Sequence, residues 1–311
     1  MLEYQHFESK HIKKTLYCCC SFQKSLFLAA IIILFFCFLA GYNGLYAANT
    51  DDSNKPVSAD AAKIGFAEGA KTKILLIASE SDHPYGTHMY MHECGLLAKC
   101  LKQNPGVDAV VIKGWPKDKG LIEQANSIVL YSGPGSDFIL VNNSKEFQEQ
   151  MEKGKGFACL HWATGVMYKE GDKQRAQKWL DYLGCIYDVN QSSVTTDYSM
   201  VIRFASDHEI CKGWKDFLIY EEYYINMKTL DAVKPLIKAN INGKEEVVGW
   251  SYLRPDGGRS YANTLGHFHY NFSNPSFLKM YLNGILWTAG YNIPQNGANC
   301  RIEPEDMVLT P

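Results

Sequence analysis

The sequence predicts an α/β protein with a doubly wound, mainly parallel sheet flanked by helices, and with added antiparallel strands in its second half. Two patterns predict this class. Between residues 73 and 160, short apolar runs that suit buried strands alternate with amphipathic segments that suit helices, which is the order of βαβ units. Beyond Trp179 the pattern changes to successive strand-like runs separated by turn residues, which is typical of antiparallel hairpins.

The first half of the predicted fold begins at Lys73. Uninterrupted apolar runs identify its strands, and apolar residues at helical spacing identify its helices. The expected strands span residues 73–79, 107–112, 127–131 and 157–160. The expected helices span residues 88–102, 119–125 and 144–153.

The second half is predicted to be mostly strands followed by one closing helix. The pair Asn242-Gly243 is its strongest hairpin cue, because both residues tolerate the left-handed backbone of a tight turn. Asn274 precedes a proline at the start of a broad apolar face, which predicts a capped helix over residues 275–289. The expected strands span residues 194–204, 217–226, 233–241, 246–253 and 260–265.

The amino end predicts export. Four lysines lie among residues 1–24, an unbroken apolar run covers 26–40, and small residues follow at Ala47 and Ala48. This is the order of a secretory signal peptide. The alternative is an uncleaved anchor, because the apolar run extended through Leu45 approaches the roughly 20 residues that span a bilayer. We therefore divide the chain into a leader (1–48), a linker (49–71) and one α/β domain (72–311), and expect a secreted, periplasmic or membrane-anchored protein.

Charge and cysteine content exclude several classes. The formal charge is −2, and it becomes −4 without the four lysines and two glutamates of the leader, so no nucleic-acid partner is expected. Membrane contact is expected only through the leader, if it is uncleaved. The six cysteines after the leader form no CxxC pair, which excludes the zinc-ribbon and thioredoxin-type patterns. We expect buried thiols, and the spacing selects no disulfide.

Histidines follow three of the predicted strands. His161 comes directly after the strand of residues 157–160, His83 and His88 lie in the polar segment after the first strand, and His267 and His269 follow the last strand. Ligands bind at the carboxyl ends of the strands in an open α/β sheet. We therefore expect these imidazoles at one edge of the sheet.

A pair of glutamates supplies the carboxylate of the predicted site. In a strand of residues 217–226, Glu222 and Tyr224 point to one face and Glu221 points to the other. We expect Glu222 to face the site and Glu221 to face solvent. His92 and Glu93 lie inside the predicted helix of residues 88–102, where we expect ordinary surface roles.

Imidazoles beside a carboxylate suit two kinds of chemistry. One is general acid/base catalysis, because histidine titrates near neutral pH. The other is a divalent metal site, zinc for example, with His83, His88, His161 and His267 as ligands. No HExxH pattern supports the metal, and the sequence has no GxSxG elbow, P-loop or GxGxxG fingerprint. Cys159 lies within a strand and should point into the layers, not act as a nucleophile.

The segments SDHPYGTHMYMHECGLLAKCL, GFACLHWATG, YEEYY and GWSYLRPDGGRSYANTLGHFHYNFSNPSFLKMYLNGILWTAG resemble the ThuA-like (trehalose utilisation) family. The resemblance covers nearly all of residues 73–290. It implies a fold like that of class I glutamine amidotransferases, in which a strand-to-helix elbow carries a nucleophilic cysteine. Here His161 holds the elbow position, so amidotransferase chemistry is not expected. The matching family positions are His83, His88, His161, Glu222, Tyr224 and His267.

The resemblance also implies a role in carbohydrate metabolism, in particular with sugars oxidised to 3-keto glycosides. Our leading hypothesis is an enzyme acting on a small-molecule sugar or glycoside, a lyase, hydrolase or isomerase, with His161, Glu222 and His267 as its catalytic acids and bases. A non-catalytic carbohydrate-binding protein and a metal-dependent hydrolase are the alternatives. The expected substrate contacts are His83, His88, Trp162, Tyr224 and His269.

Overall fold

A computed structural model describes residues 64–168 and 173–309 of the 311-residue chain. The predicted leader and most of the predicted linker lie outside the described residues. Within the described ranges, no helix is long and apolar enough to cross a membrane.

A nine-stranded sheet forms the centre of the domain, in the order β2-β1-β3-β4-β12-β11-β10-β7-β8. Its first five strands are parallel, so their carboxyl ends meet at one edge. This confirms the predicted doubly wound core, and the sheet order shows the added antiparallel strands at its far side. The parallel strands are β1 (Thr72–Ala78), β2 (Val107–Lys113), β3 (Ser127–Tyr131), β4 (Gly156–Leu160) and β12 (Arg259–Asn263).

The remaining four strands extend the sheet in antiparallel fashion from β12. The turn between β10 and β11 is the predicted one, since Asn242 and Gly243 have φ values of 54° and 80°. Two positive φ angles in a two-residue loop match the twist of a hairpin. The antiparallel strands are β7 (Ser193–Arg203), β8 (Phe217–Ile225), β10 (Lys234–Ile241) and β11 (Lys244–Leu253).

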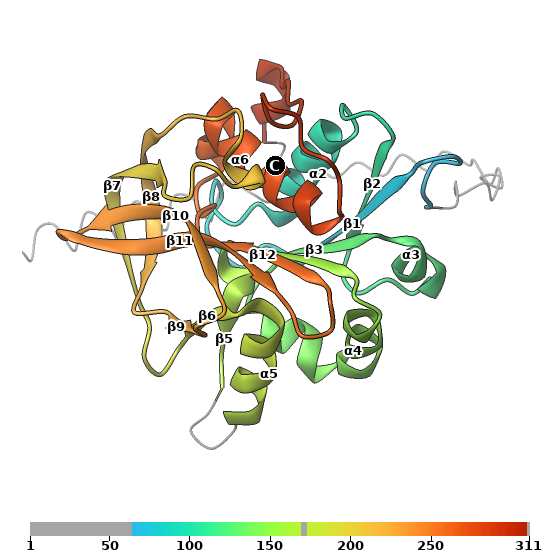
Figure 1. Ribbon diagram of the computed structural model, residues 1–311, viewed down its shortest axis with the longest axis horizontal. Coiled ribbons are helices and arrows are strands. Elements are labelled where there is room, and N and C mark those ends of the chain that lie inside the picture. Colours follow the sequence, from blue (N-terminus) through green and yellow to red (C-terminus); the bar gives the residue numbers. More distant parts are fainter. Residues whose placement is uncertain (1–63, 169–172, 310–311) are drawn as a thin grey trace, which may run out of the picture. The chain divides into compact units, whose positions relative to one another are not determined.

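Helices cover both faces of the sheet (Figure 1). On β1, Ile74 and Leu76 join the core cluster that contains α2 and α6, whereas Leu75 and Ile77 join the cluster that contains α3, α4 and α5. This alternation is the reason that the strand is apolar at every position. The helices are α2 (Tyr90–Leu101), α3 (Lys119–Gln124), α4 (Ser144–Glu152), α5 (Lys173–Leu183) and α6 (Pro275–Thr288).

Two boundaries show how local chemistry sets the elements. Asn274 caps α6 as predicted, because its side chain accepts from the backbone N–H groups of Ser276 and Phe277. The helix predicted to start at His88 instead begins at Tyr90. His88 has a left-handed φ of 49°, which no α-helix accommodates.

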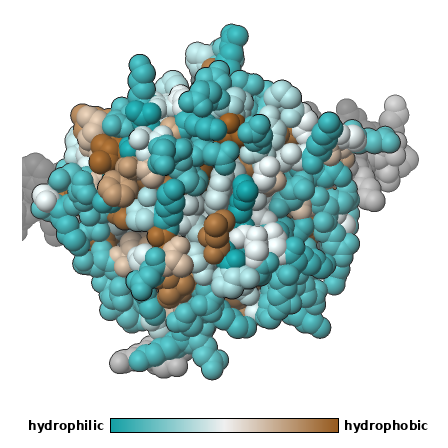
Figure 2. Space-filling view, viewed as in Figure 1, coloured by the Kyte–Doolittle hydropathy of each residue, from teal (hydrophilic) through white to brown (hydrophobic). Residues whose placement is uncertain are grey.

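A small three-stranded sheet lies beside α5 and was not predicted. Its strands are β5 (Gly165–Val166), β6 (Cys185–Asp188) and β9 (Lys228–Thr229). Of the described cysteines, all six are free thiols and Cys159 is fully buried. This agrees with the prediction that Cys159 points into the layers. Figure 2 shows that most of the viewed face is hydrophilic, with apolar side chains gathered on the side of the antiparallel strands.

Candidate active site

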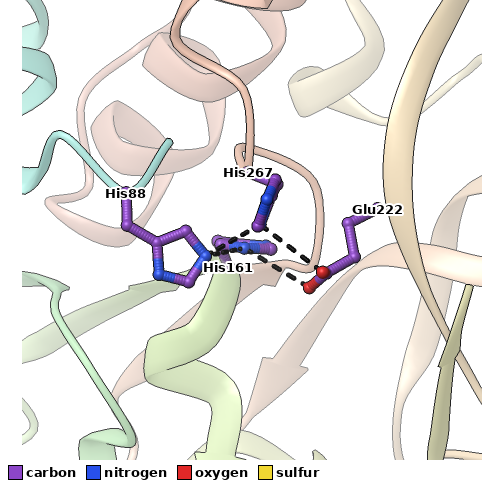
Figure 3. Close-up of side chains that lie close together, drawn as sticks. All are labelled: His88, His161, Glu222 and His267. Carbon is purple, nitrogen blue, oxygen red and sulfur yellow. Dashed lines mark hydrogen bonds and ion pairs between the residues drawn. The ribbon is translucent and has the colours of Figure 1, made fainter. Parts of the chain in front are cut away.

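Four segments that lie far apart in the sequence bring His88, His161, Glu222 and His267 together (Figure 3). His161 follows β4, His88 precedes α2, Glu222 lies on β8 and His267 follows β12. The structure therefore joins the three residues that we predicted to be catalytic, and adds His88.

His161 occupies a strained elbow. It follows the last residue of β4, begins a short 3-10 helix (His161–Thr164) and has a φ of 51°. Its side chain is completely buried, and Nδ1 donates to the carbonyl of Thr264 at 2.6 Å. Because a carbonyl can only accept, the Nε2 atom carries the lone pair that faces the cluster.

His88 is oriented in the same way by a carboxylate. Its Nδ1 lies 2.9 Å from Asp82 Oδ1, and the Tyr90 hydroxyl donates to the same carboxylate oxygen at 3.0 Å. The carboxylate can only accept, and the Tyr90 hydroxyl, 2.7 Å from Nδ1, gives its hydrogen to that carboxylate. Nδ1 of His88 therefore carries the proton, and Nε2 faces His161 at 2.9 Å. Asp82 and Tyr90 were not among the predicted site residues.

His267 is positioned by a buried carboxylate. Gly266 has a φ of 113°, which turns the chain sharply after β12. The backbone N–H groups of Gly266 and His267 then donate to Glu221 at 3.1 and 3.0 Å. This loop places His267 Nδ1 2.9 Å from His88 Nε2.

The prediction that Glu221 faces solvent is wrong. Its side chain is fully buried and also accepts from the side chain of Asn271 at 2.8 Å. The β-strand alternation is intact, but the loop after β12 covers the face that we expected to be open. Glu222 faces the site as predicted, and its carboxylate lies 3.8 Å from His161 Nε2 and 3.5 Å from His267 Nδ1.

Burial keeps the imidazoles of this cluster neutral. Burial, followed by the neighbouring His83 and His267, lowers the pKa of His88 to about 2. Burial, followed by His88, lowers the pKa of His161 well below its usual value, and burial lowers that of His267 to about 4. Burial raises the pKa of Glu222 above the ordinary glutamate value. Near neutral pH the cluster therefore presents uncharged imidazoles.

The accessible side of the site is formed by residues at its margin. Exposed His83 packs against His88, with ring centroids 3.6 Å apart and the ring planes tilted by 39°, and its Nδ1 lies 2.8 Å from Asp82. The ring of Trp162 lies 6.0 Å from that of Tyr224, which stacks on His161. Of the predicted substrate contacts, His83 and Trp162 lie at this margin, whereas Tyr224 is buried beneath it.

His269 is not brought into the cluster. Its Nδ1 pairs with Glu93 at 2.9 Å and its Nε2 with the carbonyl of Met307 at 3.0 Å. Both ring nitrogens are thus occupied by the protein. Glu93 was expected to have a surface role but is buried, because α2 turns it toward this histidine.

A metal ion would find four ligand atoms in the cluster. His88, His161, Glu222 and His267 each offer one ligand atom, all within 4.8 Å of one another. The predicted ligand set contained His83 in place of Glu222. Asp82, His83 and His88 form a second, more exposed group that shares His88 with the first.

Fold and site together define a doubly wound α/β protein in which a histidine occupies the turn after strand β4. The family model described as ThuA, trehalose utilisation, matches residues 82–288. The chain therefore belongs to the ThuA family, and this membership indicates a carbohydrate-related role.

Three solved structures are similar to this chain, and the first of them shares its fold. A ThuA-like protein from Bacteroides uniformis is 15% identical with a TM-score of 0.54, over 72% of this chain and 94% of that one. A glutamine amidotransferase from Thermotoga maritima is 10% identical with a TM-score of 0.36, over 62% and 75%. A β-galactosidase from Rahnella sp. R3 is 10% identical with a TM-score of 0.43, over 72% of this chain and 32% of that one. A search of the curated proteins finds no match.

Proposed function

We propose that this protein is an enzyme acting on a sugar or glycoside, including 3-keto derivatives, and that the cluster of His88, His161, Glu222 and His267 is its reaction centre. One observation carries the proposal. Three imidazoles and a carboxylate from four distant segments converge at the carboxyl edge of the parallel strands, where α/β folds bind ligands. A site that only bound sugar would not need so many buried titratable groups.

Glu222 is the proposed base. Its side chain is 19% exposed, whereas that of His161 is fully buried, so a bound sugar reaches Glu222 more readily. Its raised pKa makes it a stronger base than an ordinary glutamate. Next to a keto group, the C–H bond is acidic, and its proton passes to the carboxylate while the bonding electrons form an enolate.

The enolate then reacts in one of two ways. If it expels the glycosidic oxygen on the carbon adjacent to the deprotonated one, a new C=C bond forms and the released alcohol takes up a proton. If it is reprotonated from the other face, the sugar is isomerised instead. In both cases an imidazole beside Glu222 stabilises the enolate oxygen, the role that we assign to His267 with His161 holding the geometry behind it.

Trp162 is the proposed sugar platform. Its ring lies edge to face with buried Tyr224 beside the cluster, and the flat face of an aromatic ring packs against the apolar C–H face of a sugar. Trp162 is partly exposed, so a sugar can reach it. Replacing Trp162 by Ala should weaken substrate binding more than it slows the bound reaction.

The test is a panel of keto and non-keto disaccharides with product detection by mass spectrometry. Glu222→Gln should lower turnover at least about 100-fold, the lower range for loss of a general base. The matched control is His208→Gln, because His208 precedes the short 3-10 helix Glu209–Cys211, packs against Trp287 and is not part of the cluster. Tight sugar binding without any product, unaffected in rate by Glu222→Gln, would favour a binding protein instead.

We also propose that the enzyme works outside the cytoplasm or on a membrane surface. The basis is the lysine-rich, then apolar, then small-residue order of residues 1–48. Amino-terminal sequencing of the protein from a cell envelope fraction tests this. A new terminus near residues 47–49 indicates a cleaved signal peptide, an intact terminus in the membrane indicates an anchor, and an intact terminus in the cytoplasm contradicts both.

A further inference from the structure

We infer that His88, His161, His267 and Glu222 bind one divalent transition-metal ion, and that zinc is the ion this donor set fits best. The reaction of such an ion rests on the proposed function, whereas its binding does not. Three observations carry the inference: the direction of the imidazole lone pairs, the spacing of the ligand atoms and the anchoring of His88 and His161 from behind.

The lone pairs converge without a hydrogen between them. Thr264 fixes the proton of His161 on Nδ1, and Asp82 fixes that of His88 on Nδ1. Both Nε2 atoms are therefore acceptors, yet they lie 2.9 Å apart. Two acceptors at this distance repel unless a positive group lies between them.

A proton does not meet this need well. A proton on His267 Nδ1 can form a hydrogen bond to Nε2 of His88, at 2.9 Å. The contact between Nε2 of His88 and Nε2 of His161 is then still left without a hydrogen. A metal cation satisfies all of these lone pairs at once, because neutral imidazole is its normal ligand.

The spacing of the ligand atoms is close to that of a tetrahedral site. Zinc bonds of about 2.0–2.1 Å place neighbouring ligands roughly 3.3 Å apart. The contacts around the cluster are 2.9 Å for His88 with His161, 2.9 Å for His88 with His267 and 3.5 Å for His267 with Glu222. Small side-chain movements suffice to place an ion among them.

Two of the histidines are also held from behind by a group that metal ligands commonly use. Asp82 holds the ring of His88 and the Thr264 carbonyl holds the ring of His161. His267 is held through its backbone N–H, which donates to Glu221. Carboxylates and carbonyls on the far ring nitrogen orient a ligand and raise its basicity. His269 shows the contrast, because both of its ring nitrogens are used by the protein and none is left for an ion.

Three imidazoles with one carboxylate select the class of ion. Imidazole suits zinc, copper, iron and nickel, whereas calcium and magnesium prefer oxygen ligands. Glu222 and His267 retain some exposure, so one side of the ion would be open to a ligand from solution. There the ion would polarise a sugar carbonyl or hydroxyl oxygen as a Lewis acid.

The experiment uses the full chain without a polyhistidine tag, treated with a chelator and dialysed. Titration with zinc chloride in a calorimeter, followed by metal analysis, should give about one tightly bound equivalent per chain. Cobalt added in place of zinc should give the visible absorption bands of a four-coordinate site. Affinity in His267→Gln should fall at least about 100-fold, at or beyond the upper end of the 10–100-fold typical of outer-shell changes.

Variants keep the test independent of folding. His161→Gln alters a fully buried side chain, so a loss of binding there does not separate ligation from folding. His267→Gln and Glu222→Gln alter partly exposed side chains and carry the decision, with circular dichroism as the folding check. His92→Gln and His208→Gln are the controls and should bind as wild type, because these imidazoles lie outside the cluster. The inference is overturned if no ion binds tightly, if folded His267→Gln keeps wild-type affinity, or if a control variant loses the ion.

The outcomes separate this inference from the proposed function. If no ion binds but keto-glycoside products form, the proposed function is supported and the metal site is refuted. If one ion binds and is lost in the ligand variants, but no sugar in the panel reacts, the metal site is supported and the proposed reaction is refuted.

Discussion

Replacing Glu221 by Ala should lower the free energy of unfolding, because this buried carboxylate holds the loop that carries His267. Glu221 contacts neither a ligand atom of the cluster nor the accessible side of the site, yet its carboxylate receives four donors. These are the backbone N–H groups of Glu222, Gly266 and His267 and the side-chain amide of Asn271. The side chain is fully buried, so in Glu221→Ala water does not readily take the place of the carboxylate as the acceptor for these donors.

The magnitude follows from these four bonds. A buried donor left without an acceptor costs about 1–3 kcal/mol, and hydrogen bonds to a charged group are worth about 1.5–3 kcal/mol each. The four donors share one carboxylate and relax together, so the costs are not additive. We expect Glu221→Ala to lower the free energy of unfolding by about 3–5 kcal/mol, the range for breaking a buried charged network. Glu221→Gln keeps one acceptor oxygen and should cost roughly half as much.

The assay is urea unfolding, measured above the pKa of about 7 to which burial raises the Glu221 carboxyl. A shifted midpoint with an unchanged slope reports stability alone. The matched control is Glu222→Gln on the same strand. It should change stability by less than about 0.5 kcal/mol, as a partly exposed position does, while lowering turnover at least about 100-fold. A loss below about 1 kcal/mol in Glu221→Ala, or equal losses in the two Gln variants, would refute the reasoning.

Three further predictions test the packing around the site. Gly284→Ala should destabilise the domain by about 1–3 kcal/mol in thermal unfolding, because the added Cβ would lie 2.1 Å from the Tyr261 ring; an unchanged melting temperature would contradict this. A double-mutant cycle of Glu93→Gln and His269→Gln should give a coupling of at least about 1 kcal/mol in the free energy of unfolding, because Glu93 Oε1 and His269 Nδ1 are buried and lie 2.9 Å apart. Additive effects of the two substitutions would argue against this pairing. Burial lowers the pKa of Lys155 to about 8, so between that pH and the ordinary lysine value of about 10.4 the folded state binds fewer protons than the unfolded state. The free energy of unfolding should therefore rise with pH across this window, and the rise should disappear in Lys155→Met.

The parallel core was predictable because its signals are local. Apolar runs mark β1, β3 and β4, and the rule that carboxyl ends share one edge then places His161 and His267 near each other. The hairpin at Asn242 and the cap at Asn274 were likewise predicted, since each depends on two or three adjacent residues.

The contacts that give the site its chemistry are not local. Glu221 was expected to face solvent because strand alternation says which face a residue takes, but not what covers that face. The pairing of Glu93 with His269 joins positions 176 residues apart, and no pattern along the chain relates them. The helix α5 could have been found, because Ala176, Trp179, Leu180 and Leu183 form its buried stripe.

The backbone itself marks the site. Four non-glycine residues of the described ranges have a left-handed φ, and two of them are Asn226 and Asn242, a residue type that tolerates this conformation in turns. The other two are His88 and His161, which meet in the cluster. Glycine at either position would relieve the strain but remove an imidazole, so the chain gives up some stability to hold two lone pairs at one point. Strain of this kind persists only where the surroundings impose it, and here Asp82 and the Thr264 carbonyl do so.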